Sequence, residues 1–340
     1  MPRLEVSGAS MRRRDFIRLA SGAAAWPLAA RAQQSRSIKR IGILLPFSEN
    51  DQQIQTEVQT FRAAIELLGW NERSNVKFEA RWAGGDAERL QSLAKELVEL
   101  PCDVILTRNT PVTAAVRRET STIPIVFVLV ADPVGDGFVQ SLARPGGNIT
   151  GFSTVEPSLG GKWLELLREI APQVGQVGVM FDPNTAPNGG SFYFRLIETA
   201  AASIAVGVST APVSDDKDIF RTIEASAKER NFGVIVMPDQ TTTVRRKAII
   251  EAAARYRVPT IYPYLFAADE GGLISYGFEV ADIYRQAAGY IDRILRGSKP
   301  DELPVQEPVR FQLIINLNAA KSLGLVVPPI MQQSADKVIE

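Results

Sequence analysis

Residues 41–69 read IGILLPFSENDQQIQTEVQTFRAAIELLG, and this stretch decides the class of fold. It begins with the apolar run IGILL, which predicts a buried strand. Apolar residues then recur at helical spacing: Ile54, Val58, Phe61, Ile65 and Leu68. The pattern stops at Gly69, a residue type that commonly follows the end of a helix. The stretch therefore predicts one βα unit.

The same alternation continues along the chain. We expect strands at 76–82, 103–107, 123–130, 148–152, 177–181, 207–210, 234–237, 260–262 and 311–315. We expect helices from Leu90 to Leu100, from Pro111 with Thr110 as the N-cap, and at 134–142, 159–170, 191–205, 217–229, 244–256 and 283–295. Apolar strands separated by helices indicate parallel sheets covered on both faces. The predicted fold class is α/β, with two doubly wound parallel-sheet lobes joined by a hinge.

A weak internal repeat supports two lobes. IPIVFV followed by PGGNITGFS in the first half is echoed by VPTIYP followed by GGLISYGF in the second. We assign residues 37–152 with about 277–305 to the first lobe, and 153–276 with about 306–340 to the second. The predicted helix at 283–295 would return the chain to the first lobe, as a hinge requires.

The N-terminal segment reads like an export signal. In SMRRRDFIRLASGAAAWPLAARAQQ, Arg13 and Arg14 resemble the twin-arginine pair, and a short apolar run follows them. Ala30 and Ala32 supply small residues for cleavage before Gln33. The segment 1–32 is therefore predicted to be a cleavable signal that sends the protein to the periplasm.

Composition excludes several classes of function. The chain has 38 Lys+Arg and 38 Asp+Glu, and removing residues 1–32 takes away six basic and two acidic side chains, leaving a net charge of −4. This balance argues against a nucleic-acid partner. No histidine is present, which excludes Ser-His chemistry, and the single Cys102 is expected to be a buried thiol. Phosphate-loop motifs are missing as well, so we expect no cofactor and no metal.

Polar and aromatic residues gather where the predicted strands end. In open α/β sheets the ligand crevice lies outside the carboxyl ends of the strands. The candidate ligand-binding residues are Phe47, Ser48, Asn109, Thr110, Asp132, Ser153, Asp182, Asn184, Asp239, Tyr262 and Tyr276. Each of them is also a residue type that caps helices, forms turns or fills a core, and that interpretation stays open for any single one.

Four stretches carry a resemblance to a known family. The signal, the run ADPVGDGFVQSLARPGGNITG, the segment PTIYPYLFAADEGGLISYG and the ending DELPVQEPVRFQLIINLNAAKSLGLVVPP resemble the ABC transporter substrate-binding proteins related to tryptophan-binding members. The resemblance implies a type I periplasmic-binding fold whose lobes close on a small ligand, with a membrane permease and an ATPase as partners. Arg108 and Asn109 stand where family members often carry a small residue, and this more polar lip favours a carboxylate or an aromatic acid.

Three functions remain to be weighed at this stage. The first is capture of a small, amino-acid-like or aromatic carboxylate by a monomeric importer component. The second is a sensory module that presents the same ligand to a membrane receptor, which uptake by a deletion strain would distinguish. The third is a two-lobe enzyme using Asp132, Asp182 and Asp239, which loss of turnover without loss of binding in Asp132→Asn would reveal.

Overall fold

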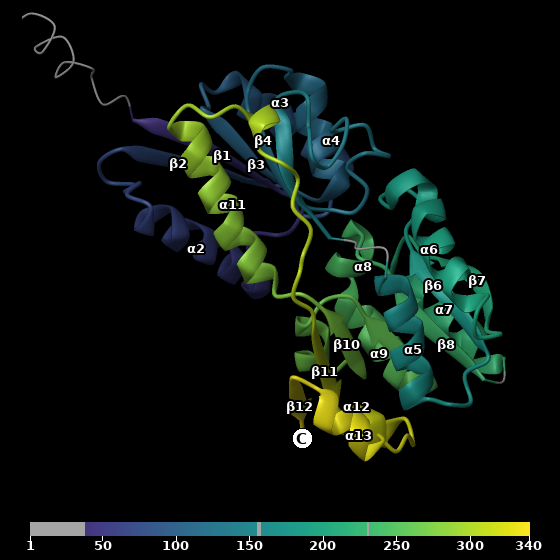
Figure 1. Ribbon diagram of the computed structural model, residues 1–340. Helices are drawn as coiled ribbons and strands as arrows, with labels where there is room; N and C mark the ends of the chain where they lie inside the picture. Colours follow the sequence, from purple (N-terminus) through teal and green to yellow (C-terminus); the bar gives the residue numbers. More distant parts are fainter. Residues whose placement is uncertain (1–37, 155–157, 230) are drawn as a thin grey trace, which may run out of the picture. The chain divides into compact units, whose positions relative to one another are not determined.

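The computed structural model describes residues 38–154, 158–229 and 231–340. The proposed signal, with Arg13, Arg14, Ala30 and Ala32, lies outside the described residues. Within the described part, two sheets are present, and both are covered by helices on each face (Figure 1). The predicted α/β class is confirmed.

The first sheet has five parallel strands in the order β2-β1-β3-β4-β5. Its strands are β1 (Lys39–Leu45), β2 (Val76–Trp82), β3 (Val104–Arg108), β4 (Ile125–Val130) and β5 (Ile149–Ser153). The helices that follow β1, β2 and β3 are α2 (Gln52–Leu67), α3 (Ala87–Glu99) and α4 (Asn109–Glu119). One face of the sheet packs on α2, and the other packs on α3 and α4. Burial on both faces explains why these strands read as continuous apolar runs.

Local chemistry fixes α2, the helix of the opening stretch. The side chain of Asp51 accepts hydrogen bonds from the backbone N–H groups of Gln53 and Ile54, which satisfies two donors that the helix itself leaves unpaired. At the other end, Gly69 has a φ of +96°, a conformation that favours glycine. The predicted βα unit is present as expected.

The second sheet has seven strands in the order β12-β11-β10-β9-β8-β6-β7, parallel except for the β10/β11 pair. They are β6 (Gln176–Phe181), β7 (Gly207–Pro212), β8 (Phe232–Val236), β9 (Thr260–Tyr262), β10 (Ile274–Gly277), β11 (Gln312–Asn316) and β12 (Lys337–Ile339). The accompanying helices are α5 (Leu159–Ile170), α6 (Ser191–Ala201), α7 (Asp216–Lys228), α8 (Gln240–Val244), α9 (Arg246–Tyr256), α10 (Phe266–Asp269), α12 (Leu317–Ser322) and α13 (Pro329–Ser334), with the 3₁₀ turns Pro187–Gly190 and Pro300–Glu302.

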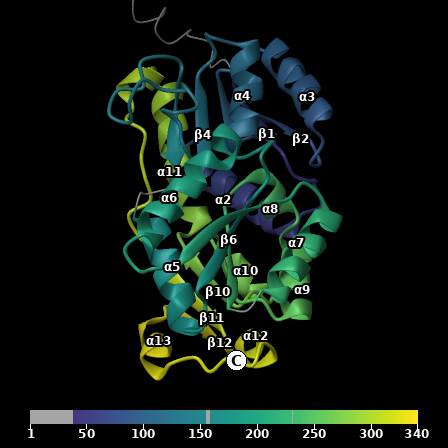
Figure 2. The same ribbon diagram turned by 90° about the vertical axis from the view of Figure 1, so that its right-hand side faces the viewer.

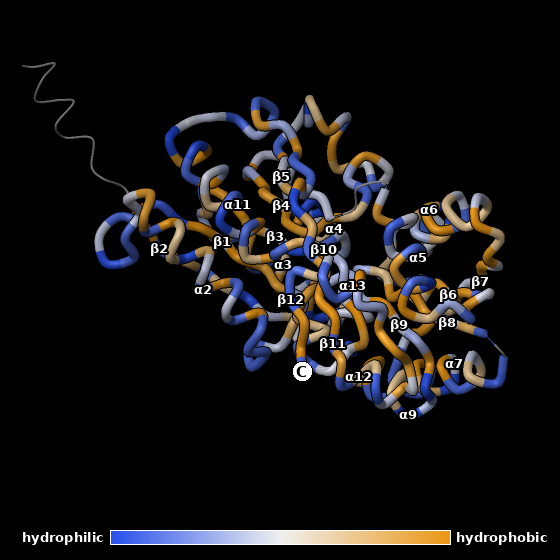
Figure 3. Tube along the Cα trace, turned by 60° about the horizontal axis from the view of Figure 1, so that its bottom comes forward, coloured by the Kyte–Doolittle hydropathy of each residue, from blue (hydrophilic) through white to orange (hydrophobic). Residues whose placement is uncertain are grey.

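Helices cover both faces of the second sheet as well. Figure 2 shows α5 and α6 on one side of β6, with α7 and α9 on the other, and the buried clusters follow the same division. The strands β4, β8 and β11 are coloured mainly as hydrophobic in Figure 3, as expected for strands that lie between two helical layers.

The chain leaves the second sheet and later returns to it. After β10 it forms α11 (Val280–Leu295), which lies beside α2 and packs on the first sheet (Figure 1). The indole N–H of Trp70 donates to Asp292 over 2.8 Å and ties the end of α2 to α11. The chain then runs beside β5, where Thr150 Oγ1 donates to the carbonyl of Leu303, before it enters β11. The lobe boundaries given above stay predictions.

Two local predictions are wrong. Residues 134–142 form turns instead of a helix, because Asp132 Oδ1 accepts the N–H of Gly135 at 2.8 Å and Gly137 has a φ of +69°. A side chain at position 135 would meet the Asp132 carboxylate. In addition, α4 begins at Asn109, whose side chain accepts the N–H of Val112 at 3.2 Å, so Thr110 is not the cap.

Candidate functional site

The carboxyl ends of the two sheets meet. Asn109, the first residue after β3, donates through its amide to the side chain of Gln240 after β8, at 3.5 Å. Arg246, at the start of α9, pairs with Asp51 at the start of α2, with 3.1 Å between Nη1 and Oδ2. Residues from both sheets therefore surround one region, as the position of ligand crevices in open α/β sheets predicts.

A buried arginine lies at the end of β3. Arg108 is 2% exposed, and its guanidinium forms an ion pair with the equally buried Glu57 of α2. Nη1 also donates to the Tyr284 hydroxyl at 3.3 Å, and the guanidinium lies 4.8 Å from the centre of the Phe47 ring. The other nitrogen, Nη2, is buried and has no hydrogen-bond partner among the described residues. A buried donor without an acceptor is costly, so this nitrogen is suited to donate a hydrogen bond to a ligand.

Asn109 holds an unusual backbone conformation beside this arginine. Its φ is +66°, which asparagine tolerates better than most residues, and its carbonyl accepts the Thr113 hydroxyl at 2.8 Å. Strained residues of this kind cluster at ligand sites, where the surrounding structure holds them in place. The conformation directs the Asn109 amide towards Gln240 across the cleft.

The next strand end carries an acidic turn. The hydroxyl of Thr110 donates to Asp136 Oδ2 at 3.1 Å, so it is already engaged. Burial raises the pKa of Asp136 to about 6, and the negative charge of Asp132 adds to the rise, while the Thr110 hydrogen bond opposes it. Ser153, at the end of β5, is buried and directs its hydroxyl at the carbonyl of Ala131 over 3.5 Å.

Two buried aspartates organise the ends of β6 and β8. Asp239 accepts the backbone N–H groups of Asp182 and Thr242, each at 2.9 Å. Asp182 in turn accepts the Asn184 amide at 3.0 Å and the Thr241 hydroxyl at 2.6 Å. Burial raises the pKa of Asp239 to about 7, and the nearby Asp182 charge raises it further, against the hydrogen bonds that favour the carboxylate. In the described chain these two carboxylates hold the loops after β6 and β8 in place.

The remaining candidates lie in different surroundings. Phe47 is buried beneath Arg108, whereas Ser48 is exposed. Tyr262 is buried in the core on the α7 and α9 side of the second sheet, and burial raises its pKa. The half-buried Tyr276 stacks on Phe311, with 5.9 Å between ring centres. The structure thus brings Phe47 and Asn109 to the meeting of the sheets, and places Tyr262 in a core.

Arg108 was noted in the sequence only as a neighbour of Asn109, and Thr154 and Tyr193 were not among the candidates. Arg108 and Thr154 each have a buried polar atom without a partner among the described residues, Nη2 in one and Oγ1 in the other. The hydroxyl of Tyr193, from α6, donates to the carbonyl of Pro238 at 3.2 Å. Burial raises the pKa of Tyr193 well above its usual value, and the negative charge of Asp239 adds to the rise. Thr154 comes directly after GFS, the end of a predicted strand. Its place after a strand was the only feature of the sequence that pointed to a role in the site.

Comparisons with known proteins identify the family. Residues 41–339 match the model of the ABC transporter substrate binding proteins, so the chain belongs to that family. It is 26% identical over 266 residues to the tyrosine-binding protein of Clostridioides difficile (strain R20291), covering 78% of this chain and 75% of that protein.

Solved structures agree with this family. The ABC domain from Streptococcus pneumonia in complex with L-Trp is 22% identical, with a TM-score of 0.82, over 89% of this chain and 100% of that one. A conserved domain protein from Vibrio cholerae o1 biovar eltor is 27% identical, with a TM-score of 0.82 and the same coverage. The expected two-lobed, type I periplasmic-binding fold is therefore confirmed, and the protein is a substrate-binding component of an ABC transporter.

Two features are absent from the part of the chain that the structure describes. Among the residues of this part, no helix is both long and apolar enough to cross a membrane. The same residues contain no group of three or more His, Cys, Asp or Glu side chains arranged to hold a metal ion. Cys102 is buried, and burial raises the pKa of its thiol to about 11.

Proposed function

We propose that this protein captures a small carboxylate-bearing solute, amino-acid-like or aromatic, between the carboxyl ends of its two sheets. The observation that carries this proposal is that two buried donors at the carboxyl ends of β3 and β5, Arg108 Nη2 and Thr154 Oγ1, have no partner among the described residues. A guanidinium nitrogen and a hydroxyl are groups that bind carboxylate oxygens well. The rings of Phe47 and Tyr284 lie beside Arg108, with their centres 4.8 and 6.0 Å from its guanidinium.

The relatives support the same ligand class. One similar protein is named for binding tyrosine, and one similar structure holds L-Trp. Both ligands carry a carboxylate and an aromatic ring. Glu57 already balances the Arg108 charge, so the preference for an acid rests on the Nη2 donor. A carboxylate oxygen accepts a charge-assisted hydrogen bond from this nitrogen, which is stronger than the bond that the oxygen of the corresponding neutral amide would accept.

Capture is proposed to work by closure of the lobes. The Asp51–Arg246 ion pair and the Asn109–Gln240 hydrogen bond join groups that would separate if the cleft opened. A ligand that touches both sides shifts the equilibrium towards the arrangement in which these contacts form. In this account the protein is exported to the periplasm by the twin-arginine route and acts there as a monomer. It delivers its ligand to a membrane permease and an ATPase.

A thermal-shift screen of residues 33–340 tests the ligand class. L-Trp, L-Tyr, aromatic acids, short carboxylates and nucleosides are compared, with each amino acid tested beside its amide. A ligand at 100 times its Kd is expected to add about 2.7 kcal/mol to the unfolding free energy, which gives a clear rise in Tm. The variant Thr154→Val should lose part of the rise, and the exposed Thr199→Val, on α6, serves as the matched control. Equal shifts from acids and amides would contradict the proposal.

A further inference from the structure

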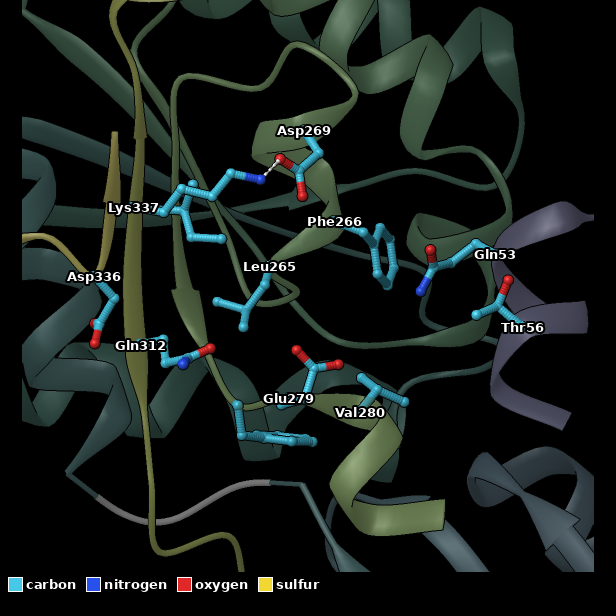
Figure 4. A pocket seen from close by; sticks show the side chains of 12 residues that line it. Gln53, Thr56, Leu265, Phe266, Asp269, Glu279, Val280, Gln312, Asp336 and Lys337 are labelled. Atoms are coloured by element: carbon cyan, nitrogen blue, oxygen red, sulfur yellow. Dashed lines mark hydrogen bonds and ion pairs between the residues drawn. The ribbon is translucent and has the colours of Figure 1, made fainter. Parts of the chain in front are cut away.

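A pocket lies next to the Asp51–Arg246 ion pair, with Gln53 and Phe266 among the residues that line it. It has a volume of 510 Å³, which is within the range of small-molecule sites. One wall comes from the first turns of α2, and the others come from α10, from the β10–α11 connection and from the ends of β11 and β12. Figure 4 shows Gln53 and Thr56 of α2 on one side of the pocket, with Phe266 next to Gln53 and Leu265 farther away. We call it the hinge pocket, because it touches the chain where it passes from the second sheet to α11.

The floor of the hinge pocket is apolar. Leu265, Phe278, Val280 and Ile314 line it and are each between 5% and 8% exposed. Phe266 forms a wall of the pocket. The Arg246 guanidinium lies over its ring, 5.3 Å from the ring centre. An apolar group placed on this floor would be removed from water on most sides, which stabilises a bound state.

The rim of the hinge pocket has an excess of negative charge. Asp269, Glu279, Asp336 and Lys337 line it, and Lys337 is paired with Asp269. Within the described residues, neither Glu279 nor Asp336 has a Lys or Arg partner. Asp336 accepts the N–H of Leu313 at 2.8 Å, whereas Glu279 has only a long contact of 3.4 Å to the N–H of Ala281. Figure 4 shows the Glu279 carboxylate between Gln312 and Val280, on the side that faces Leu265.

We propose that the hinge pocket binds a small organic cation with an apolar body, such as an aryl- or alkylammonium ion. The apolar floor accommodates the body, and the carboxylates of Glu279 and Asp336 attract the ammonium group. The pocket is also linked to the Asp51–Arg246 ion pair. Gln53 lies one turn or less from Asp51, and Phe266 contacts Arg246. A molecule that touches both Gln53 and Phe266 therefore favours the arrangement in which Asp51 and Arg246 are paired. The site differs in place and charge from the cleft that contains Arg108.

Titration with benzylamine tests the site, with benzyl alcohol as the neutral molecule of the same shape and benzoate as the anion. Binding is followed by calorimetry and saturation-transfer NMR. We expect benzylamine to bind about tenfold more tightly than benzyl alcohol, and benzoate not to bind there. The double variant Glu279→Gln with Asp336→Asn keeps both backbone acceptors and should lower benzylamine affinity by about tenfold.

Further variants separate the hinge pocket from other places. Thr56→Trp fills the pocket from α2 and should abolish binding even if the double variant is poorly folded. Glu72→Gln, in a different surface groove, is the matched control and should have no effect. Thr154→Val, in the cleft, should also leave benzylamine binding unchanged. Equal affinity for benzyl alcohol, full binding by the Thr56→Trp variant, or no binding at millimolar benzylamine would each overturn the proposal.

Discussion

The Asp51–Arg246 ion pair offers the sharpest perturbation of cleft closure. Arg246 and Asp51 have side chains that are 9% and 17% exposed, with contacts of 3.1 and 3.4 Å between guanidinium nitrogens and carboxylate oxygens. In Asp51→Asn the amide oxygen can still cap α2, because asparagine caps helices as well as aspartate does. The amide nitrogen then faces the guanidinium, so the ion pair is lost while the helix is kept.

The expected size of the effect follows from these contacts. A hydrogen bond to a charged group contributes about 1.5–3 kcal/mol, and Arg246 keeps its second partner, Glu270, at 2.9 Å. We therefore expect the closed form to lose about 1–2 kcal/mol, which weakens ligand binding by about 5- to 30-fold. Calorimetry with the ligand found by thermal shift measures the affinity, and small-angle scattering measures the compactness of the bound protein.

A matched control exists in the same chain. Asp86 caps α3 through the same kind of contacts to the N–H groups of Glu88 and Arg89 and takes part in none of the ion pairs found in the described residues. Asp86→Asn should leave ligand affinity within about twofold of the parent, since only a cap of equal strength is exchanged. If Asp51→Asn binds ligand as tightly as Asp86→Asn and gives the same scattering curve, the closure argument is refuted.

Three other predictions concern buried groups. The pKa of Asp239 is raised from 3.8 to about 7, so its contribution to stability is present below pH 4 and is lost as the pH rises towards 7. Urea unfolding at several pH values measures this. Between pH 4 and 7 the unfolding free energy of the parent should fall by up to about 1.4 kcal/mol per pH unit relative to that of Asp239→Asn. An equal change of unfolding free energy with pH in both proteins would contradict the prediction. Glu57→Gln leaves the buried Arg108 charge uncompensated and should lower the unfolding free energy by about 3–5 kcal/mol. Replacing both Glu57 and Arg108 by Met should lower it much less, because no unpaired charge is left buried. Urea unfolding of the two variants measures both effects, and equal losses of stability would contradict the prediction. Trp163→Phe removes the 2.7 Å hydrogen bond to the carbonyl of Tyr276 and should lower the unfolding free energy by about 1–3 kcal/mol, and a Tm equal to that of the parent would count against it.

Much of the fold could be predicted because its signals are local. Continuous apolar strands such as β4 and helices with regular apolar spacing such as α2 are readable within a dozen residues. The failed helix at 134–142 shows the limit of such patterns. There the N–H of Gly135 donates to the Asp132 carboxylate, and Gly137 has a positive φ, so the chain turns instead of forming helical hydrogen bonds. The spacing of apolar residues reveals neither feature.

The candidate site was less readable because its contacts are distant in sequence. Arg108 meets Glu57 across 51 positions and Tyr284 across 176, so neither partner is visible from the strand ending alone. Asp182 and Asp239 illustrate the opposite problem. A ligand-binding aspartate and a loop-holding aspartate follow a strand in the same way, and only the hydrogen bonds to the backbone and to Thr241 distinguish them. Their contact with ligand stays a prediction.

Hydrogen–deuterium exchange with and without the strongest ligand from the thermal-shift screen tests the central claim most directly. The claim is that ligand lies between the carboxyl ends of the two sheets, which meet at Asn109 and Gln240. We predict slower exchange at residues 47–51, 108–113, 131–136 and 239–246, which come from both sheets. Slower exchange confined to one sheet, or confined to the hinge pocket at residues 278–281 and 312–314, would contradict the account.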